Sequence, residues 1–574
     1  MLCYFDILFL PSKVGNGERM IKETLRFLWF RVALVLSVLI AYPALVKAEA
    51  TFHDVTSTVI VNSLEALPKK HFLRQLYTQL LFVPVWIQED KLSSLTQELF
   101  EHIGEDKTLN SSSKLKQDAK QLAQTAKKVY AAYASLKEKV SLEFKIAQLY
   151  KGYADYTLYG SINWGAFQGR LYNLREHGIK ADWVTYKPAF NPVSLVESAV
   201  LSGSLENMFS KASPKEYHYD ALKEKLLSYR EMSKQGGWGH LDFKGTLRVG
   251  KNYKTIPNIR ERLQKSADYK PCGTPETKVY DKCLKTAVMH FQKRHGLVAK
   301  GVLGQKTKKA LNVPIELRIR QISLNLDRIK WLHERNLERH IIINIPAFSL
   351  SFEEDSTLRK EMRVIVGKRK NPTPIFSNTV QTIVLNPHWN IPKSIIQKEM
   401  IPKLMKNPNA MAKQGIEIHT GWGKDAAKID GGSVDWSEYR YSKSMPFRFA
   451  QVPGYKNALG KIKFLFPNQF AVYMHDTPNK KLFNRNVRAF SHGCIRLHKP
   501  RELLKTFSTF NDNIDFGKSQ KRLKGNKKSY LKLGTKVPVD VVYLTAYVDY
   551  EGVLQFRSDI YGYDKMQLQS YRQW

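Results

Sequence analysis

The hydrophobic periodicity of the chain changes near His340, and this change limits the folds that the chain can adopt. Before that residue, apolar positions recur at helical spacing, as in the Ala-, Leu-, Lys- and Glu-rich segment 112–150. After it, β-rich runs such as IIINIP, RVIVG and VQTIVL are separated by Gly, Pro and Asn. At 574 residues, the chain is also too long for one ordinary domain. We therefore expect a multidomain α+β protein.

Composition shifts and breaker residues predict where the domains begin and end. The expected order is a helical scaffold over 51–257, a small helical domain over 258–314, a linking helix over 315–339, a β-rich domain over 340–550 and a C-terminal tail over 551–574. Inside the β-rich domain, the polar and Gly-rich stretch 394–454 is expected to be an insertion that covers a site, with helical character near 393–405. The basic run 518–528 is expected to be a solvated loop.

The N-terminal segment has the pattern of a secretory signal peptide. Fifteen uncharged residues, Val32 to Val46, follow three basic ones, and Val46-Lys47-Ala48 offers a small-x-small cleavage site. We therefore expect residues 1–48 to be a signal, with a true start at Met20 as one reading, and the protein to be exported to the periplasm. The alternative is an uncleaved signal that anchors the protein in the inner membrane.

The charge of the chain points to anionic partners. Its formal net charge is +39, which favours association with polyanions. An exported chain rarely meets nucleic acid, so we expect attraction to an anionic cell envelope and no nucleic-acid partner. An equally simple reading is that the charge aids solubility.

The four cysteines divide into three kinds. Cleavage of the signal would remove Cys3. Cys272 and Cys283 flank a turn-rich stretch, and an oxidising compartment would let them pair. Cys494 is then the odd cysteine, either a reactive thiol or an inert buried one.

The small helical domain resembles the three-helix peptidoglycan-binding family. The matching elements are Leu263-Gln264, Ala287-Val288, Phe291-Gln292, His295-Gly296-Leu297, the turn 301–304 and the closing helix 307–312. Lys300 stands where the family often has Asp. His290 and His295 are five residues apart and do not share a helix face, so we expect no metal site there.

The residues around Cys494 carry the chemistry of a thiolate acyl transfer. They read Ser491-His492-Gly493-Cys494-Ile495-Arg496, and Tyr473-Met474-His475-Asp476 lies upstream at the end of an expected strand. A histidine can take the thiol proton, Gly493 permits a tight turn that exposes backbone N–H groups, and Arg496 would favour the thiolate. Residue chemistry alone does not distinguish His475 from His492 as the base.

The spacing His-x15-Ser-His-Gly-Cys resembles the L,D-transpeptidase catalytic domain of the YkuD type. Further stretches are similar to the large periplasmic class of that family: 318–332, 343–346, 386–395, 451–464, 473–478 and 556–564. The resemblance implies a β-sandwich-like catalytic domain with a capping insertion. It also implies Cys494 as nucleophile, His475 as base, the Asp476 carbonyl as the group that orients the base, and Tyr473 with the N–H groups of Gly493 and Cys494 around the oxyanion. Ser491, His492 and Arg496 would support the site.

The family resemblance further implies the reaction and its partners. Cys494 would attack diaminopimelate in a donor tetrapeptide stem, D-Ala would leave, and an amine of an acceptor stem would resolve the thioester into a 3→3 cross-link. No cofactor is expected, and carbapenems are expected to acylate the cysteine. The alternatives are an L,D-carboxypeptidase, an enzyme that attaches a lipoprotein to the wall, a wall-cutting cysteine peptidase and a binding protein without activity.

Overall fold

The computed structural model describes residues 46–574 except 133, 273–277, 333–337, 424 and 573. The expected signal peptide lies almost wholly outside the described residues. The chain forms two compact units. In the described chain, the first takes in residues 46–104, Gln117–Lys151 and Pro192–Met208, and the second Glu105–Lys116, Gly152–Asn191 and Phe209–Trp574. Within the described ranges, no helix is long and apolar enough to cross a membrane.

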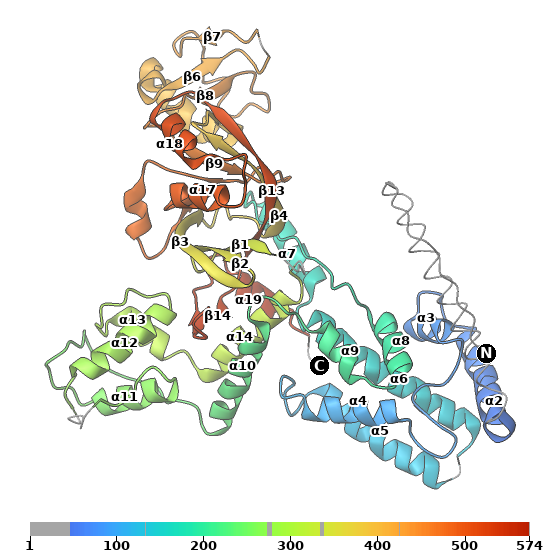
Figure 1. Ribbon diagram of the computed structural model, residues 1–574. Coiled ribbons are helices and arrows are strands. Elements are labelled where there is room, and N and C mark those ends of the chain that lie inside the picture. The colour runs from blue at the N-terminus through green and yellow to red at the C-terminus, as the bar shows by residue number, and fades with distance from the viewer. Residues whose placement is uncertain (1–45, 133, 273–277, 333–337, 424, 573) are drawn as a thin grey trace, which may run out of the picture. The chain divides into compact units, whose positions relative to one another are not determined.

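The described chain from Val46 to Lys234 is mainly helical, as its periodicity predicts (Figure 1). In the first unit the Glu143 carboxylate is fully buried, accepts hydrogen bonds from the Tyr77 hydroxyl and two backbone N–H groups, and has a pKa raised to about 7 by burial. The helices are α2 Val46–Leu64, α3 Phe72–Gln79, α4 Ser94–Glu105, α5 Lys114–Ala131, α6 Leu136–Tyr159, α7 Trp164–Glu176, α8 Pro192–Ser202, α9 Glu206–Ala212 and α10 Tyr219–Lys234.

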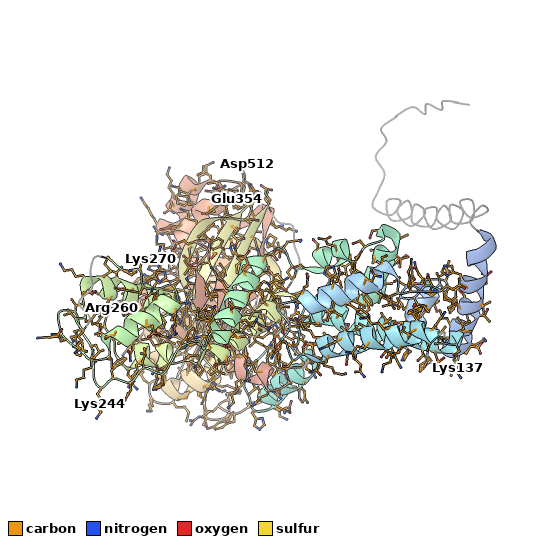
Figure 2. All side chains as sticks on the ribbon, turned by 90° about the horizontal axis from the view of Figure 1, so that it is seen from below. Lys137, Lys244, Arg260, Lys270, Glu354 and Asp512 are labelled. Carbon is orange, nitrogen blue, oxygen red and sulfur yellow. A yellow bond between two sulfur atoms is a disulfide. The ribbon has the colours of Figure 1, made fainter. Side chains whose placement is uncertain are left out.

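Three short helices form the expected small domain: α11 Ile256–Lys265, α12 Lys282–Arg294 and α13 Gln305–Leu311. Asp281 caps α12 by accepting a hydrogen bond from the Leu284 N–H, and its carboxylate also pairs with Arg260 at 2.6 Å. Arg260, on α11, is labelled in Figure 2. Gly296, at φ 63°, ends α12 in the left-handed conformation that glycine adopts without strain. A disulfide joins Cys272 to Cys283.

The small domain packs against the C-terminal part of the same unit. The His295 ring stacks between Phe291 and Phe556, with ring centroids 3.8 and 5.3 Å away. Arg557 donates a hydrogen bond to the Arg294 carbonyl at 2.9 Å. Helix α14, Ile315–Ile329, then leads toward the β-rich domain as the expected linking helix.

The β-rich domain is one closed sheet. Its strand order is β11-β3-β12-β10-β9-β4-β13-β1-β2, and β2 pairs with β3 as well. The first part of β3 pairs with β2 and its end with β12, so the expected sandwich-like domain is a single continuous sheet around a core. The strands are β1 Arg339–Asn344, β2 Ser349–Glu354, β3 Thr357–Gly367, β4 Phe376–Leu385, β9 Ile462–Leu465, β10 Met474–His475, β11 Ala489–Ser491, β12 Ile495–Leu497 and β13 Ser529–Val542.

The insertion has its own sheet and its own core, which the sequence did not predict. The strand order is β5-β8-β6-β7, and Ile418, Trp436 and Phe449 are buried beneath it. The helical character expected near 393–405 is present in α15 Lys393–Ile395, the π-helical η1 Ile396–Met400 and α16 Ile401–Leu404, and short 3-10 turns follow at Pro408–Ala410 and Ala412–Gln414. The strands are β5 Trp389–Asn390, β6 Ile416–His419, β7 Lys428–Ile429 and β8 Arg448–Gln451.

Further helices and a C-terminal hairpin complete the second unit. Figure 1 shows α17, Pro500–Ser508, and α18, Phe516–Lys524, beside the sheet. The basic run 518–528 was expected to be a loop, but much of it lies in α18, because Asp515 caps the helix and Leu523 is buried in the core. The 3-10 turn Lys480–Asn484, strands β14 Ala546–Val548 and β15 Leu554–Phe556, and α19 Tyr563–Leu568 complete the elements.

Candidate active site

The register of β9, β10 and β12 gathers the predicted site residues on one face. β10 is parallel to β12, with Met474 opposite Ile495 and His475 opposite Arg496. Because side chains alternate along a strand, Met474 and Ile495 point into the core, where both are fully buried. His475 and Arg496 therefore share the other face.

The same register extends the face to the nucleophile candidate. The Ile495 N–H donates to the Tyr473 carbonyl at 3.0 Å, so Cys494 lies beside Tyr473 just before β12 begins. On the other side of β10, Lys463 of β9 is the partner of His475. The Lys463 ammonium sits 3.6 Å from the centre of the Tyr473 ring. The sheet thus brings together a thiol, an imidazole, a phenol and two cations.

The His475 ring is buried and fixed by the backbone. Its Nδ1–H donates to the Asp476 carbonyl at 2.5 Å, so in the neutral ring Nε2 carries no proton and can accept one. Burial and the neighbouring Arg496 charge lower the pKa of His475 to about 3. The imidazole is therefore neutral near pH 7, as a general base must be.

The Cys494 thiol has three hydrogen-bond partners among the described residues: the Ala471 carbonyl at 3.9 Å, and the backbone N–H and hydroxyl of Tyr473. The His475 ring is not one of them. Burial raises the pKa of Cys494, and the Tyr473 groups, Lys463 and Arg496 oppose that effect. Arg496 therefore favours the thiolate, as predicted, but burial outweighs Arg496 and the other nearby cations, so the pKa of the thiol stays above its ordinary value.

Asp476 supports the site in two ways. Its carbonyl orients the imidazole, while its carboxylate accepts from the Lys461 N–H at 3.0 Å and the Thr477 N–H at 2.7 Å and pairs with Lys480 at 2.6 Å. Gly460 is needed beside it, because a Cβ atom there would lie 2.5 Å from the Asp476 carboxyl carbon.

Hydrogen bonds of the Ser491 side chain stabilise the turn that precedes Cys494. The Ser491 hydroxyl donates to the Cys494 carbonyl at 2.6 Å and accepts from the Gly493 N–H at 3.2 Å. Gly493 has φ 116°, a conformation that residues with a Cβ rarely adopt. The Gly493 N–H, predicted to face the oxyanion, is thus bonded within the turn. The Cys494 N–H has no acceptor among the described residues and fits that role better.

Two residues far from the cysteine motif in the sequence, Thr373 and Tyr561, hold this turn in place, and Tyr561 lies in the stretch 556–564 that resembles the family. The Thr373 hydroxyl donates to the Gly493 carbonyl and accepts from the Gly367 N–H, both at 2.8 Å. The hydroxyl of Tyr561, from the C-terminal tail, accepts from the Thr373 N–H and donates to the Gly367 carbonyl. The sequence offers no signal for Thr373, and the resemblance of the stretch 556–564 assigns Tyr561 no role, because each acts through a long-range contact.

The insertion reaches the site at two points. His492 is exposed beside the nucleophile and pairs with Glu399 of η1 at 3.0 Å. The Lys368 ammonium lies 3.4 Å from the same ring nitrogen of His492. At the base of the insertion, the Trp389 side chain is hydrogen-bonded to the Tyr473 side chain. His492 therefore contacts the insertion and not the thiol. The predicted disulfide lies in the small domain, where His290 pairs with Asp268.

Three parts of the sequence match known domain families. Residues 338–539 match the L,D-transpeptidase catalytic domain (YkuD), residues 71–226 the family described as "Scaffold domain", and residues 253–311 that described as "Putative peptidoglycan binding domain". The chain therefore contains an L,D-transpeptidase catalytic domain with a scaffold domain and a peptidoglycan-binding domain. The resemblances identified from the sequence motifs are confirmed at this level.

One curated relative is named after the activity of the same catalytic domain. A Haemophilus influenzae protein named "Putative L,D-transpeptidase" is 32% identical over 247 residues, which are 43% of this chain and 48% of that protein. The chain thus matches about half the length of this curated relative.

Two solved structures also match. An L,D-transpeptidase from Stackebrandtia nassauensis is 15% identical over 53% of this chain and 95% of that chain, with a TM-score of 0.20. The LD transpeptidase LdtMt1 in complex with imipenem is 14% identical over 36% of this chain and 59% of that chain, with a TM-score of 0.16. At these TM-scores the superpositions support no inference, and the assignment rests on the family matches.

Proposed function

We propose that the protein is a peptidoglycan L,D-transpeptidase that forms 3→3 cross-links through a Cys494 thioester. The observation that carries the proposal is the shared face of β10 and β12, where a thiol lies beside a tyrosine and next to a buried neutral histidine within a YkuD-type domain. The peptidoglycan-binding domain supports a cell-wall substrate.

In the proposed reaction the substrate brings the thiol and base together. The Cys494 proton passes to His475 Nε2 as sulfur attacks the diaminopimelate carbonyl of a donor tetrapeptide, and the Cys494 N–H and Tyr473 hydroxyl stabilise the oxyanion. The amine of D-Ala takes the proton from His475 and leaves. The side-chain amine of an acceptor stem then attacks the thioester and releases the thiol.

The insertion supports transfer to an amine over transfer to water. It reaches the site through Glu399 and Trp389, and a covered acyl-enzyme is protected from hydrolysis. L,D-carboxypeptidase activity, in which water resolves the thioester, and attachment of a lipoprotein to the wall remain the alternative outcomes. Export to the periplasm is part of the proposal, since all these substrates lie there.

The direct test is incubation of the full chain with purified disaccharide-tetrapeptides, followed by mass spectrometry. Dimers and free D-Ala are expected from the unaltered chain, and neither from the Cys494→Ala variant. Tripeptides without dimers would favour the carboxypeptidase. Cleaved cross-links without dimers, or full activity in Cys494→Ala, would overturn the proposal.

A covalent probe tests the nucleophile separately. We expect a carbapenem to add its mass to the unaltered chain and not to Cys494→Ala, because a thiolate opens the β-lactam ring to form a thioester. Intact-mass measurement that finds no adduct on the unaltered chain would contradict the inhibitor part of the proposal.

A further inference from the structure

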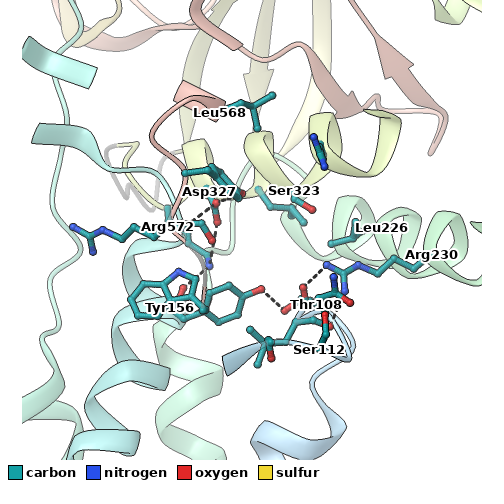
Figure 3. Close-up of a pocket in the computed structure, with 18 of the residues that line it drawn as sticks. Thr108, Ser112, Tyr156, Leu226, Arg230, Ser323, Asp327, Leu568 and Arg572 are labelled. Carbon is teal, nitrogen blue, oxygen red and sulfur yellow. Dashed lines mark hydrogen bonds and ion pairs between the residues drawn. The ribbon is translucent and has the colours of Figure 1, made fainter. Parts of the chain in front are cut away.

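A cavity of about 560 Å³ lies in the second unit, away from the Cys494 face. Segments far apart in the sequence build its wall: the loop 108–113, the end of α6, helices α10 and α14, and the C-terminal residues (Figure 3). Its volume is in the range of small-molecule sites. None of the residues assigned to the proposed reaction lines it.

Helix α14 turns a stripe of polar side chains toward this cavity. Arg320, Ser323, Asp327 and Lys330 line it at spacings of three, four and three residues, which is one helix face. The opposite positions, such as Ile322 and Ile329, are buried in an apolar core. Polar groups turned inward are costly unless they are hydrogen-bonded, hydrated or bound to a ligand.

Asp327 is the one acidic side chain among the described residues that line the cavity, and it is already engaged. Asp327 accepts from the Ser161 N–H at 3.0 Å and from the Tyr571 hydroxyl, and it pairs with Lys330 at 3.7 Å. Lys330 also donates to the Tyr156 carbonyl at 2.9 Å. Gly160 permits this close packing, because a Cβ atom there would collide with the Asp327 carboxyl group. Asp327 and Lys330 therefore neutralise each other.

Two arginines keep the wall positive. The Arg230 guanidinium donates to the carbonyls of Thr108 and Leu109 at 2.6 and 2.7 Å, which fixes it without neutralising it (Figure 3). Neither Arg230 nor Arg320 has a carboxylate within ion-pair distance in the described part of the chain. Arg572 also belongs to the wall, but Figure 3 shows its side chain turned away from the labelled cavity residues.

The rest of the wall combines flat rings with hydroxyls. The Tyr156 and Trp574 rings meet edge to face at 6.1 Å, and the Tyr156 hydroxyl is hydrogen-bonded to that of Thr108 at 2.8 Å. Rings give apolar surface, hydroxyls give hydrogen bonds, and arginine guanidinium groups suit carboxylates. This combination fits an anionic ligand with sugar-like polarity.

We propose that this cavity binds a carboxylate-bearing muropeptide without reacting with it, as a second contact between enzyme and wall. The identity of the ligand rests on the proposed function, since stem-peptide carboxylates are the anions that such an enzyme meets. The cavity would hold a wall segment that is not being cross-linked.

The test uses the full chain carrying Cys494→Ala, so that substrate binds without turnover. Hydrogen–deuterium exchange is followed with and without purified disaccharide-tetrapeptide. Added protection in segments 108–113 and 219–230 is expected. Arg320→Glu should raise the ligand concentration that gives half of this protection by about tenfold. Ser323→Phe fills the cavity without changing its charge and should abolish the protection.

The matched control is Arg501→Glu, an exposed arginine on α17 outside the cavity with the same change in net charge. It should leave the protection unchanged. Equal weakening by Arg320→Glu and Arg501→Glu, or protection confined to other segments, would overturn the proposal. So would equal protection by inorganic phosphate or by anionic vesicles at matched charge, since the cavity would then be a general anion site.

Failure of this inference is distinguishable from failure of the proposed function. D-Ala release by the chain with Cys494 intact reports on the reaction alone. Release without cavity protection refutes only the second site, whereas absence of release refutes the reaction, whatever the cavity binds.

Discussion

At the scale of single residues, the reactivity of Cys494 depends on a balance between burial and nearby cations. Burial raises the pKa of the thiol, and Lys463 and Arg496 lower it. The same Arg496 charge lowers the pKa of His475, which weakens the base. Arg496 thus favours loss of the thiol proton while making its acceptor less basic.

Lys463 offers a clean test of that balance. Lys463→Gln should raise the pKa of Cys494 further, because a cation next to the thiolate is lost. The thiolate fraction rises with pH, so the rising part of the pH–rate profile should move to higher pH. Iodoacetamide alkylation of the Cys494 peptide, quantified by mass spectrometry from pH 6 to 10, measures this.

Arg485→Gln, an exposed arginine with an unrelated backbone contact, is a suitable control for loss of one positive charge. An identical profile for the unaltered chain and Lys463→Gln would contradict the assigned electrostatics. Because the pKa of His475 is already about 3, no inflection from that ring is expected near pH 6.5.

At the scale of elements, the sequence motifs name candidate site residues but do not assign the residues that support them. Cys494 and His475 stand in a motif with fixed spacing, so they could be named from the chain alone. Thr373, Tyr561 and Trp389 act through contacts with residues far away in the sequence. Trp389 and Tyr561 fall in stretches that resemble the family, but no local pattern gives any of the three a role. The strands of the insertion are two to four residues long, too short to show a clear alternation.

The basic run 518–528 illustrates a different kind of error. Its lysines suggested a solvated loop, but Asp515 precedes the run as a helix cap and Leu523 lies within it as a core residue. Cap and apolar residue together outweigh the charge density. A high density of charged residues predicts that their side chains are exposed. Both a loop and the solvent-facing side of a helix can expose them.

The hydrogen bond from Thr373 to the turn before Cys494 should affect both the catalytic rate and the stability of the protein. Thr373→Val removes the hydroxyl that holds the Gly493 carbonyl, and it should lower kcat by about tenfold with little change in KM, because the turn positions sulfur rather than substrate. The lost buried hydrogen bonds should also cost about 1–3 kcal/mol of stability.

Thr373→Ser keeps the hydroxyl and should restore the rate, which a packing role of the methyl group would not permit. D-Ala release kinetics and thermal unfolding on the same samples separate the two effects. A proportional loss of folded protein and activity, with unchanged kcat per folded molecule, would show that Thr373 is merely structural.

At the scale of the whole molecule, the catalytic and peptidoglycan-binding families were recognisable because each carries its own motif, whereas the scaffold was expected only from its helical composition. The closure of the catalytic sheet was not predictable, because β3 changes its partner strand midway. Local sequence does not determine which strands pair or in which register. The order of the domains along the chain could be predicted, and their packing through Phe556 and Arg557 could not.

The disulfide allows a test of how independent the small domain is. Cys272→Ser with Cys283→Ser should destabilise residues 253–311 by about 2–3 kcal/mol, seen as faster proteolysis of that region. D-Ala release from soluble disaccharide-tetrapeptides should persist, because Cys494 lies in another domain. Loss of activity as complete as in Cys494→Ala would show that the small domain is needed for catalysis itself.

The closed catalytic sheet has a consequence for how extended peptides are selected. An open sheet edge offers a row of unpaired backbone groups onto which any extended chain can add as a further strand. Here β3 pairs with both β2 and β12, so among the described strands of this sheet only the three-residue β11 ends the order. A stem peptide can therefore gain little binding energy by pairing with this sheet as an additional strand. Discrimination between one peptide and another must then come from side chains on the loops and on the insertion, which can diverge without disturbing the barrel.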